Sequence, residues 1–446
     1  MAQWPDWRPM ARFGTVAVKV MPRAVATGRG MVESLRWRPD MPEPTDPLTS
    51  GERIKRYRQR AGMSRSVLGG LVGRSAEWVK AVESGRLLTP RLPMLMRLAE
   101  VLGITDLAEL TGAISLPVES YTKATHEALP MVADALTEYP VVGRDDEPAP
   151  VGELADRVSQ AWGLWHGTRR QRTAIAVVLP GLIRDASLAT RLYDGADRRA
   201  TLRSLAQVYH LAQLYLSFQP TPELLLLTGD RAMMAAQDAD DPIAIGAAAW
   251  YMNHIFRDAN QRHEARVELA TRSAELLRPD DGGEDLAVWG LLQLAIALSH
   301  AKVGREGDAL HYWDRAARAA RALGADYHHP WLIFGPGMVD AYAVTIQADL
   351  THGGQATRAA HTLKLLAMPS ATRRSFHLAE TGRAYFLRRD YPATVAMLKQ
   401  AWEASPDTTR FSIFARAAVT ELAERNEPEL RADIAQLAGN LGLTVT

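Results

Sequence analysis

Residues 51–112 form a series of short segments with helical periodicity, separated by residues that are typical of helix ends. Apolar residues recur every three or four positions in each segment, which predicts five short helices. The residues that end or cap these helices are Gly62, Ser64, Gly73, Ser75 and Gly85. Because caps and breaks follow one another so closely, this stretch is expected to fold as a small helical unit rather than as one long helix.

The second and third of these helices are joined by a tight turn with a glycine, and the later helix starts on a small hydroxyl residue. This arrangement is the helix-turn-helix pattern. The matching motifs are R-x-x-A-G-M-S at 58–64, G-R-S at 73–75, V-E-S-G at 82–85, Pro90-Arg91 and L-x-x-L-A-E-V-L-G at 95–103. On these motifs the segment resembles the Xre family, whose domain is of the lambda-repressor and Cro type.

The resemblance implies a set of DNA-contacting residues. They are Arg65, Ser75, Ala76, Glu77, Trp78, Lys80, Ala81 and Arg91. Arg65 opens the second helix and is expected at a phosphate, and Arg91 at a phosphate or in the minor groove. On the outward face of the third helix, Glu77 can accept a hydrogen bond from cytosine N4, whereas Ala76 and Ala81 offer apolar contact alone.

Two features of this expected DNA-reading face set it apart from its relatives. It contains neither Gln nor Asn, and it includes an acidic residue, so the operator sequence does not follow from the resemblance. Trp78 and Lys80 flank the face and are expected at the DNA backbone; alternatively, Trp78 packs half-buried against the helical unit. The resemblance also implies an ion pair between Arg58 and Glu83, mostly shielded from water.

Positive charge is concentrated in the same stretch. Residues 51–112 hold eleven Lys and Arg against six Asp and Glu, and residues 1–50 hold seven against five. The whole chain has a net charge of only +1, so the remainder is net acidic. This distribution is expected of a chain in which one module neutralises phosphates.

The segments on either side of this unit are irregular. Residues 1–48 contain many prolines and predict an extension that is either disordered or a basic arm on DNA. Residues 113–150 predict a helical connector followed by an acidic, proline-rich linker at 140–150. The chain has no cysteine, which excludes disulfides, thiolate zinc sites and a cysteine nucleophile, and no apolar run long enough for a membrane span.

Residues 151–446 predict helix after helix, with internal repeats. The clearest copy, 374–406, resembles a tetratricopeptide repeat: its matching residues are Leu378, Gly382, Tyr385, Leu398, Ala401 and Pro406. Looser copies lie at 246–279, 288–322 and 339–369. Stacked helix pairs of this kind form an α-solenoid with a concave surface.

The concave surface is the predicted ligand site. By the repeat pattern, the residues expected to point into its groove are Trp250, His254, Arg257, Arg383 and Phe386. Aromatic rings, arginines and a histidine suit an extended peptide or a ligand that carries a carboxylate. The alternative is that these side chains pack against a neighbouring repeat.

These observations predict an all-α, cytoplasmic transcriptional regulator in which a five-helix helix-turn-helix domain precedes an α-solenoid. We expect double-stranded DNA as its partner, a homodimer held by the repeats, and a peptide, small molecule or protein as effector. The motifs of hydrolases, nucleotide-binding loops and zinc enzymes are not found, so no catalytic activity, cofactor or metal is expected. The alternative is a repeat-based adaptor whose helix-turn-helix does not bind specific DNA.

Overall fold

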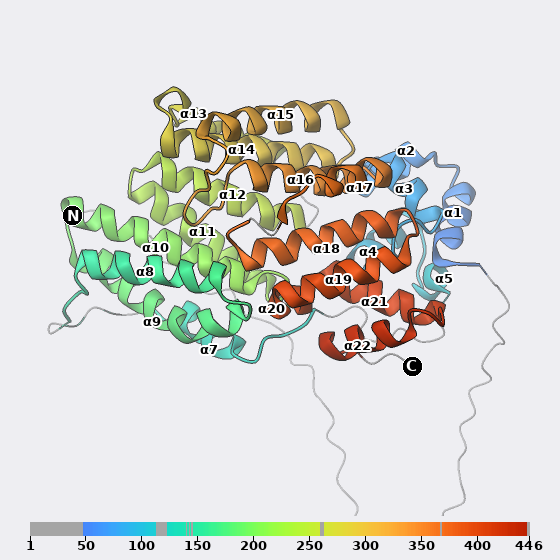
Figure 1. Ribbon diagram of the computed structural model, residues 1–446, viewed down its shortest axis with the longest axis horizontal. Coiled ribbons are helices and arrows are strands. Elements are labelled where there is room, and N and C mark those ends of the chain that lie inside the picture. The colour runs from blue at the N-terminus through green and yellow to red at the C-terminus, as the bar shows by residue number, and fades with distance from the viewer. Residues whose placement is uncertain are drawn as a thin grey trace, which may run out of the picture. The chain divides into compact units, whose positions relative to one another are not determined.

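The computed structural model describes residues 48–112, 123–139, 141, 143, 146–258, 263–365 and 368–443 of the 446-residue chain. These residues form α-helices and one short 3-10 turn, and no strand occurs among them (Figure 1). The prediction of an all-α fold is therefore confirmed. The predicted N-terminal extension up to residue 47, and residues 113–122 of the predicted connector, lie outside the described part of the chain.

Five short helices form the first part of the described chain. They are α1 (Ser50–Arg60), α2 (Arg65–Leu71), α3 (Ala76–Glu83), α4 (Leu92–Leu102) and α5 (Ala108–Thr111). Ser64 and Ser75 cap α2 and α3, because each hydroxyl accepts a hydrogen bond from the backbone N–H three residues later. Gly73, in the turn between them, has a φ of +68°, which residues with a side chain rarely adopt.

An apolar core holds these five helices together. It includes Ile54 of α1, Val79 and Val82 of α3, and Leu95 and Leu98 of α4, none of which is more than 3% exposed. Residues three apart lie on one face of a helix, so each of these pairs presents a single apolar side to the core. Burial of each such side chain stabilises the unit by roughly 1.5–3 kcal/mol.

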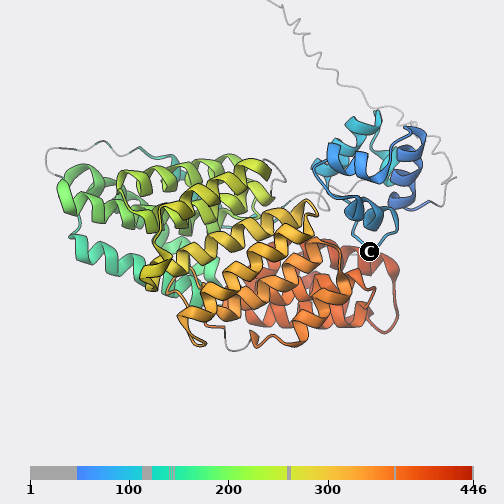
Figure 2. The ribbon, with the colours of Figure 1, turned by 90° about the horizontal axis from the view of Figure 1, so that it is seen from above.

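A long succession of helices follows, which we call the repeat-like region. Its elements are α7 (Leu129–Thr137), α8 (Val151–Gly167), α9 (Gln171–Leu192), α10 (Gly195–Leu216), α11 (Pro222–Asp238), α12 (Pro242–Asp258), α13 (His263–Glu275), η1 (Pro279–Asp281), α14 (Gly283–Lys302), α15 (Glu306–Leu323), α16 (Pro336–Asp349), α17 (Gly353–His361), α18 (Ala371–Leu387), α19 (Tyr391–Ala404), α20 (Pro406–Phe411), α21 (Ile413–Arg425) and α22 (Arg431–Leu441). Each helix from α8 to α19 packs against the next one along the chain (Figure 2).

The helix pairs expected from the repeats are present. The segments 246–279, 288–322, 339–369 and 374–406 correspond to the pairs α12–α13, α14–α15, α16–α17 and α18–α19. In the last pair a Cβ atom built on Gly382 would lie 3.4 Å from the Cβ of Met397 on the facing helix, which is an ordinary van der Waals distance, so a small side chain fits between the two helices there. Pro406 follows the end of α19 and lies in the first turn of α20.

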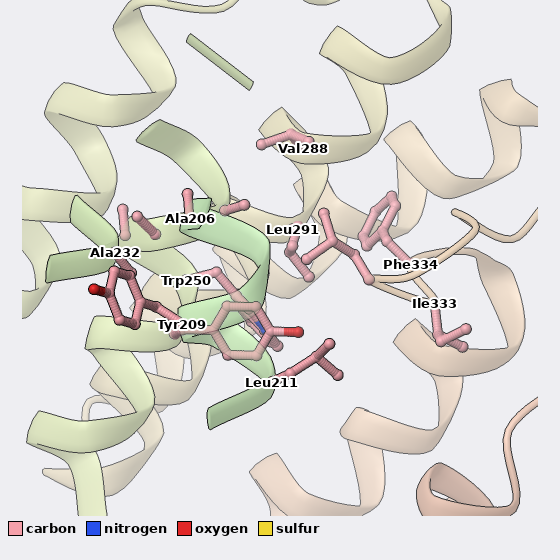
Figure 3. Packing of buried hydrophobic residues seen from close by; sticks show 14 of the residues in the cluster. Ala206, Tyr209, Leu211, Ala232, Trp250, Val288, Leu291, Ile333 and Phe334 are labelled. Atoms are coloured by element: carbon pink, nitrogen blue, oxygen red, sulfur yellow. The ribbon is translucent and has the colours of Figure 1, made fainter. Parts of the chain in front are cut away.

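A single large apolar cluster runs through the repeat-like region as far as α16 and the loop beyond α17. Trp250 of α12 is fully buried within it, together with Tyr209, Leu211 and Leu291 (Figure 3). The prediction that Trp250 points into an open groove is therefore wrong. α12 contacts α10, α11, α13 and α14, so little of its surface is left for a groove.

The boundary of the repeat-like region differs from the predicted start at residue 151. α7 precedes the proline-rich linker, yet its Leu129, Val132 and Leu136 belong to the same apolar cluster as α9 and α10. The backbone N–H of His126 also donates to Gln219 at 2.9 Å. The linker therefore connects two parts of one core, and the region begins before α7.

Among the described helices, α9 is long and apolar enough to cross a membrane by length and composition. Its Ile175, Leu179, Ile183 and Ala186 are instead buried, and the helix packs between α8 and α10. The core helix of a water-soluble fold meets the same criterion, so the composition of α9 is explained by its packing.

Candidate functional site

The outward face of α3 carries two charged side chains. Glu77 and Lys80 have side chains 55% and 52% exposed, and their charged atoms lie 3.6 Å apart. An exposed pair of this kind contributes little to stability, so both groups are available to a partner. Ala76 is half-buried beside them at the start of the helix.

Two other residues assigned to this face lie elsewhere. Ala81 is fully buried, because the chain after α3 folds back and the backbone N–H groups of Arg86 and Leu87 donate to its carbonyl at 2.9 and 3.1 Å. The expected apolar contact between Ala81 and a base is therefore ruled out. Trp78 is half-buried against the core of the five-helix unit, and the guanidinium of Arg74 lies 5.5 Å from its ring. The alternative prediction, that Trp78 packs half-buried against the helical unit, is therefore confirmed.

The ion pair expected between Arg58 and Glu83 is present. Arg58 Nε donates to Glu83 Oε1 at 2.5 Å, and the two residues are 8% and 4% exposed. Arg65, which was expected at a phosphate, donates through Nε to the other carboxylate oxygen at 2.7 Å. Burial opposes ionisation of Glu83, but the hydrogen bonds from both arginines outweigh it and lower its pKa.

Both ends of α3 contact the repeat-like region. A Cβ atom built on Gly304, in the turn after α14, would lie 2.3 Å from the Cβ of Ser75. At the other end, Arg389 Nη2 donates to the carbonyl of Ser84 at 2.9 Å. We call this the docked arrangement. Residues at the start of a recognition helix usually reach the base edges, so Gly304 occupies space that DNA would need.

A cavity of about 330 Å³ lies beside these contacts. Its lining includes Arg74 and Arg91 of the five-helix unit together with residues of the repeat-like region. The charged lining residues are Arg74, Arg91, Arg172, Lys302, Asp349, Arg373, Glu380 and Arg383. We call this the arginine-lined cavity.

Two of the predicted groove residues, His254 and Arg383, line this cavity. Phe386 does not: it is 3% exposed and packs against Tyr391 and Phe414, so its expected role in the groove is wrong. Arg257 lies in the last turn of α12, but its side chain is outside the described part of the structure. The repeat pattern places a residue on one face of its own helix, but it does not show whether a neighbouring helix covers that face. This explains the wrong predictions for Trp250 and Phe386.

Arg383 is held firmly in the cavity wall. Its Nη1 donates to Asp349 at 2.8 Å and its Nη2 to Glu380 at 2.5 Å. Burial alone would lower the pKa of Arg383, but the two carboxylates reverse the effect and raise it. Arg383 is therefore charged at any physiological pH.

Several lining residues were not identified from the sequence. Arg74 appeared only within the G-R-S motif, while Gln213, Tyr251, Thr345 and Arg373 had no recognisable pattern. They come from segments far apart in the chain, and each lies in an ordinary helical context.

The chain was compared with protein families, curated proteins and solved structures. No curated protein matches the sequence. Among solved structures, that of ComR from S. thermophilus with DNA and its signalling peptide ComS aligns with 80% of this chain and 99% of that chain, at a TM-score of 0.25 and 14% identity. Residues 51–110 match the family model described as a helix-turn-helix domain, so this chain contains a helix-turn-helix domain formed by α1 to α5.

Proposed function

We propose that this protein is a sequence-specific, DNA-binding transcriptional regulator of the Xre type. The observation that carries the proposal is the helix-turn-helix domain, in which α3 is capped by Ser75 and presents Glu77 and Lys80 on its outward face. Its tetratricopeptide-like repeats sense a peptide, small molecule or protein partner. The protein acts in the cytoplasm and has no catalytic activity of its own.

The electrostatics of the domain favour this function. It holds eleven Lys and Arg against six Asp and Glu, whereas the chain as a whole is nearly neutral. A duplex attracts such a module through counterion release, and the base edges are then read by the exposed side chains of α3. Lys80 and Arg91 are exposed and suited to phosphate contacts, and Glu77 is suited to a cytosine amino group.

The experiment that tests this function is selection of genomic fragments by the purified full-length protein. We expect a recurring site that is bound far more tightly than random DNA, with an affinity that falls steeply as salt increases. A variant in which Lys80 is replaced by Ala should weaken binding to all sequences, whereas Glu77→Ala should change the preferred base at one position. Weak DNA binding that does not depend on salt would instead support the protein-adaptor alternative.

Specific recognition also requires two copies of the domain. One helix-turn-helix covers few base pairs, and operators are commonly read by dimers whose half-sites lie about 34 Å apart or a multiple of that distance. We infer that the repeat-like region holds two chains together. Sedimentation of the protein with a selected duplex measures the stoichiometry, and a single chain on each duplex would contradict the dimer.

In the docked arrangement the start of α3 touches Gly304, so DNA binding requires the helix-turn-helix domain to separate from this turn. A ligand changes DNA affinity only if it binds the docked and the separated forms unequally. Regulation then consists of a shift between these two forms.

Replacing Gly304 with Ala is expected to raise DNA affinity. The added Cβ would collide with Ser75, which disfavours the docked arrangement. Every 1.4 kcal/mol of lost docking energy raises the population of the separated form roughly tenfold while that form is rare. Electrophoretic mobility shift or fluorescence anisotropy with a selected duplex measures the effect.

Gly442→Ala is the matched control. Gly442 and Gly304 have φ of +63° and +78°, and both follow a helix end with the same two backbone hydrogen bonds, so alanine suffers similar backbone strain at both. A Cβ on Gly442, however, meets no atom within 4 Å, so Gly442→Ala should leave DNA affinity unchanged. If both variants bind DNA as the wild type does, the contact at Ser75 does not limit DNA binding.

A further inference from the structure

The arginine-lined cavity contains an excess of positive charge. Six Lys and Arg residues line it against two acidic residues, Asp349 and Glu380. Five of the six are buried or half-buried, and Arg91 is exposed. Positive groups that are crowded together and partly removed from water are rarely left without anions, because they lose hydration. The cavity therefore has fewer negative groups than its positive groups require.

The two carboxylates are already engaged. Asp349 contacts Arg383 at 2.8 Å and Lys302 at 3.5 Å, and Glu380 contacts Arg383. Arg373 has a neutral partner instead, since its Nη1 donates to the hydroxyl of Tyr342 at 3.0 Å. Arg172 likewise donates to backbone carbonyls, including that of Asp407 at 2.9 Å. No carboxylate contacts either of these two arginines closely enough to count as an ion pair in the described part of the chain.

The cavity wall also contains polar atoms that are buried without a hydrogen bond. Within the described residues, no partner is found for Arg74 Nε, Gln213 Nε2, Tyr251 Oη, Thr345 Oγ1 and Arg383 Nε. Gln213, Tyr251 and Thr345 are only 2%, 3% and 3% exposed. Each of the five atoms can donate a hydrogen bond, and a buried donor without a partner is unfavourable because it has lost its hydrogen bonds to water. Such a group of donors is suited to a ligand rich in acceptors.

The pKa of Arg74 also indicates that the cavity has too few anions. Burial lowers its pKa to about 10, Arg383 adds to the effect by repulsion, and Asp349 opposes it. Arg74 belongs to the turn between α2 and α3, so the cavity is complete only while the helix-turn-helix domain is docked.

We propose that the arginine-lined cavity binds an organic anion with an apolar body, and that Arg74 and Arg91 hold this anion jointly with arginines of the repeat-like region. The donors described above surround its carboxylate or phosphate. The apolar body lies against the remaining wall, which includes Leu214, Ile255, Phe376 and Phe414.

The second part of the inference rests on the proposed function in DNA binding. The separated form has lost Arg74 and Arg91 from the cavity, so the anion binds the docked form more tightly. The ligand therefore decreases DNA affinity, and DNA decreases ligand affinity by the same factor. This protein would release its operator when the anion is abundant.

Binding is tested by calorimetry and thermal unfolding of the full-length protein with two pairs of probes. The first pair is octanoate and octanol; the second is an N-acetylated apolar tripeptide as the free acid and as its C-terminal amide. We expect at least one acid to bind and to raise the Tm by several degrees, whereas its uncharged counterpart does neither. The acid that binds distinguishes a fatty-acid-like ligand from a peptide carboxylate.

Three variants and one control locate the site. Arg74→Gln and Arg373→Gln should weaken binding of the acid at least tenfold, whereas Arg157→Gln should not, because Arg157 pairs with Asp185 at 2.7 Å outside the cavity. Tyr251→Phe removes a hydroxyl for which the described residues provide no partner. It should leave the free protein as stable as the wild type or more so, and still weaken binding of the acid.

The proposal is overturned if neither acid binds, if each acid and its uncharged counterpart bind equally, or if Tyr251→Phe, Arg74→Gln and Arg373→Gln all retain full affinity. The effect on DNA is measured separately, with a selected duplex and the acid that binds. A protein that binds the acid but no DNA would contradict the proposed function and leave the cavity assignment standing. Unchanged or increased DNA affinity in the presence of the acid would overturn the coupling alone.

Discussion

The free energy of unfolding of the repeat-like region is expected to fall steeply as the pH decreases from about 6.5 towards 4. Four buried histidines cause this: burial lowers the pKa of His166, His210 and His300 to about 4 and that of His377 to about 3, from an ordinary value of 6.5. Above pH 6.5 these side chains are neutral in both the folded and the unfolded chain. Between 6.5 and 4 the unfolded chain binds protons that the folded chain excludes, so acid favours unfolding.

The slope can be large because the histidines act together. Each one contributes up to about 1.4 kcal/mol for every pH unit within this window. Chemical denaturation followed by circular dichroism at pH 7, 6, 5 and 4.5 measures the dependence. A stability that is constant from pH 7 to 4.5 would show that the folded protein accepts these protons.

Substitution of His377 distinguishes the effect of histidine protonation from other causes of unfolding in acid. His377 is fully buried, and neither ring nitrogen has a hydrogen-bond partner among the described residues. We therefore compare the free energy of unfolding of His377→Leu with that of the wild type at two pH values. The difference is expected to shift in favour of the variant between pH 7 and pH 5. His166→Leu is the contrasting variant: the ring nitrogens of His166 contact Ser370 Oγ and the Trp331 carbonyl, both at 2.9 Å, so its loss should destabilise the protein at pH 7, where the histidine is neutral in both states.

Replacing Glu83 with Gln is expected to destabilise the helix-turn-helix domain by about 3 kcal/mol or more. The carboxylate contacts Arg58 and Arg65 from inside the domain, and its side chain is only 1% exposed. Gln keeps the shape but not the charge, so Arg58 remains buried without an anion. Hydrogen exchange of the full-length protein measures the change locally: amides of α1 and α3 should exchange roughly a hundredfold faster.

Glu77→Gln provides the control for this variant. Glu77 lies on the same helix and also pairs with a basic residue, but its side chain is 55% exposed. Exposed pairs of this kind contribute about 0–1 kcal/mol, so exchange should barely change. Equal protection of α1 and α3 in Glu83→Gln and in the wild type would mean that the ion pair is not important for the domain.

The sequence by itself determined the local structure of this protein. Helix starts depend on a hydroxyl and the backbone N–H groups up to three residues away, as at Ser64 and Ser75, so they can be recognised from short patterns. The same holds for the helix pairs, whose apolar spacing and small residues, such as Gly382, are visible along the chain. The Arg58–Glu83 ion pair could be predicted because the family resemblance implied a contact between these two segments.

Only the tertiary structure decided what those helices present to a ligand. Trp250 and Phe386 occupy groove positions of the repeat pattern, but neighbouring helices cover both, and the loop after α3 covers Ala81. The arginine-lined cavity combines Arg74 with residues such as Arg373, about three hundred positions later in the chain. Burial and cavity composition depend on packing between distant segments, whereas periodicity and capping act within a few residues, and the sequence pattern records only the latter.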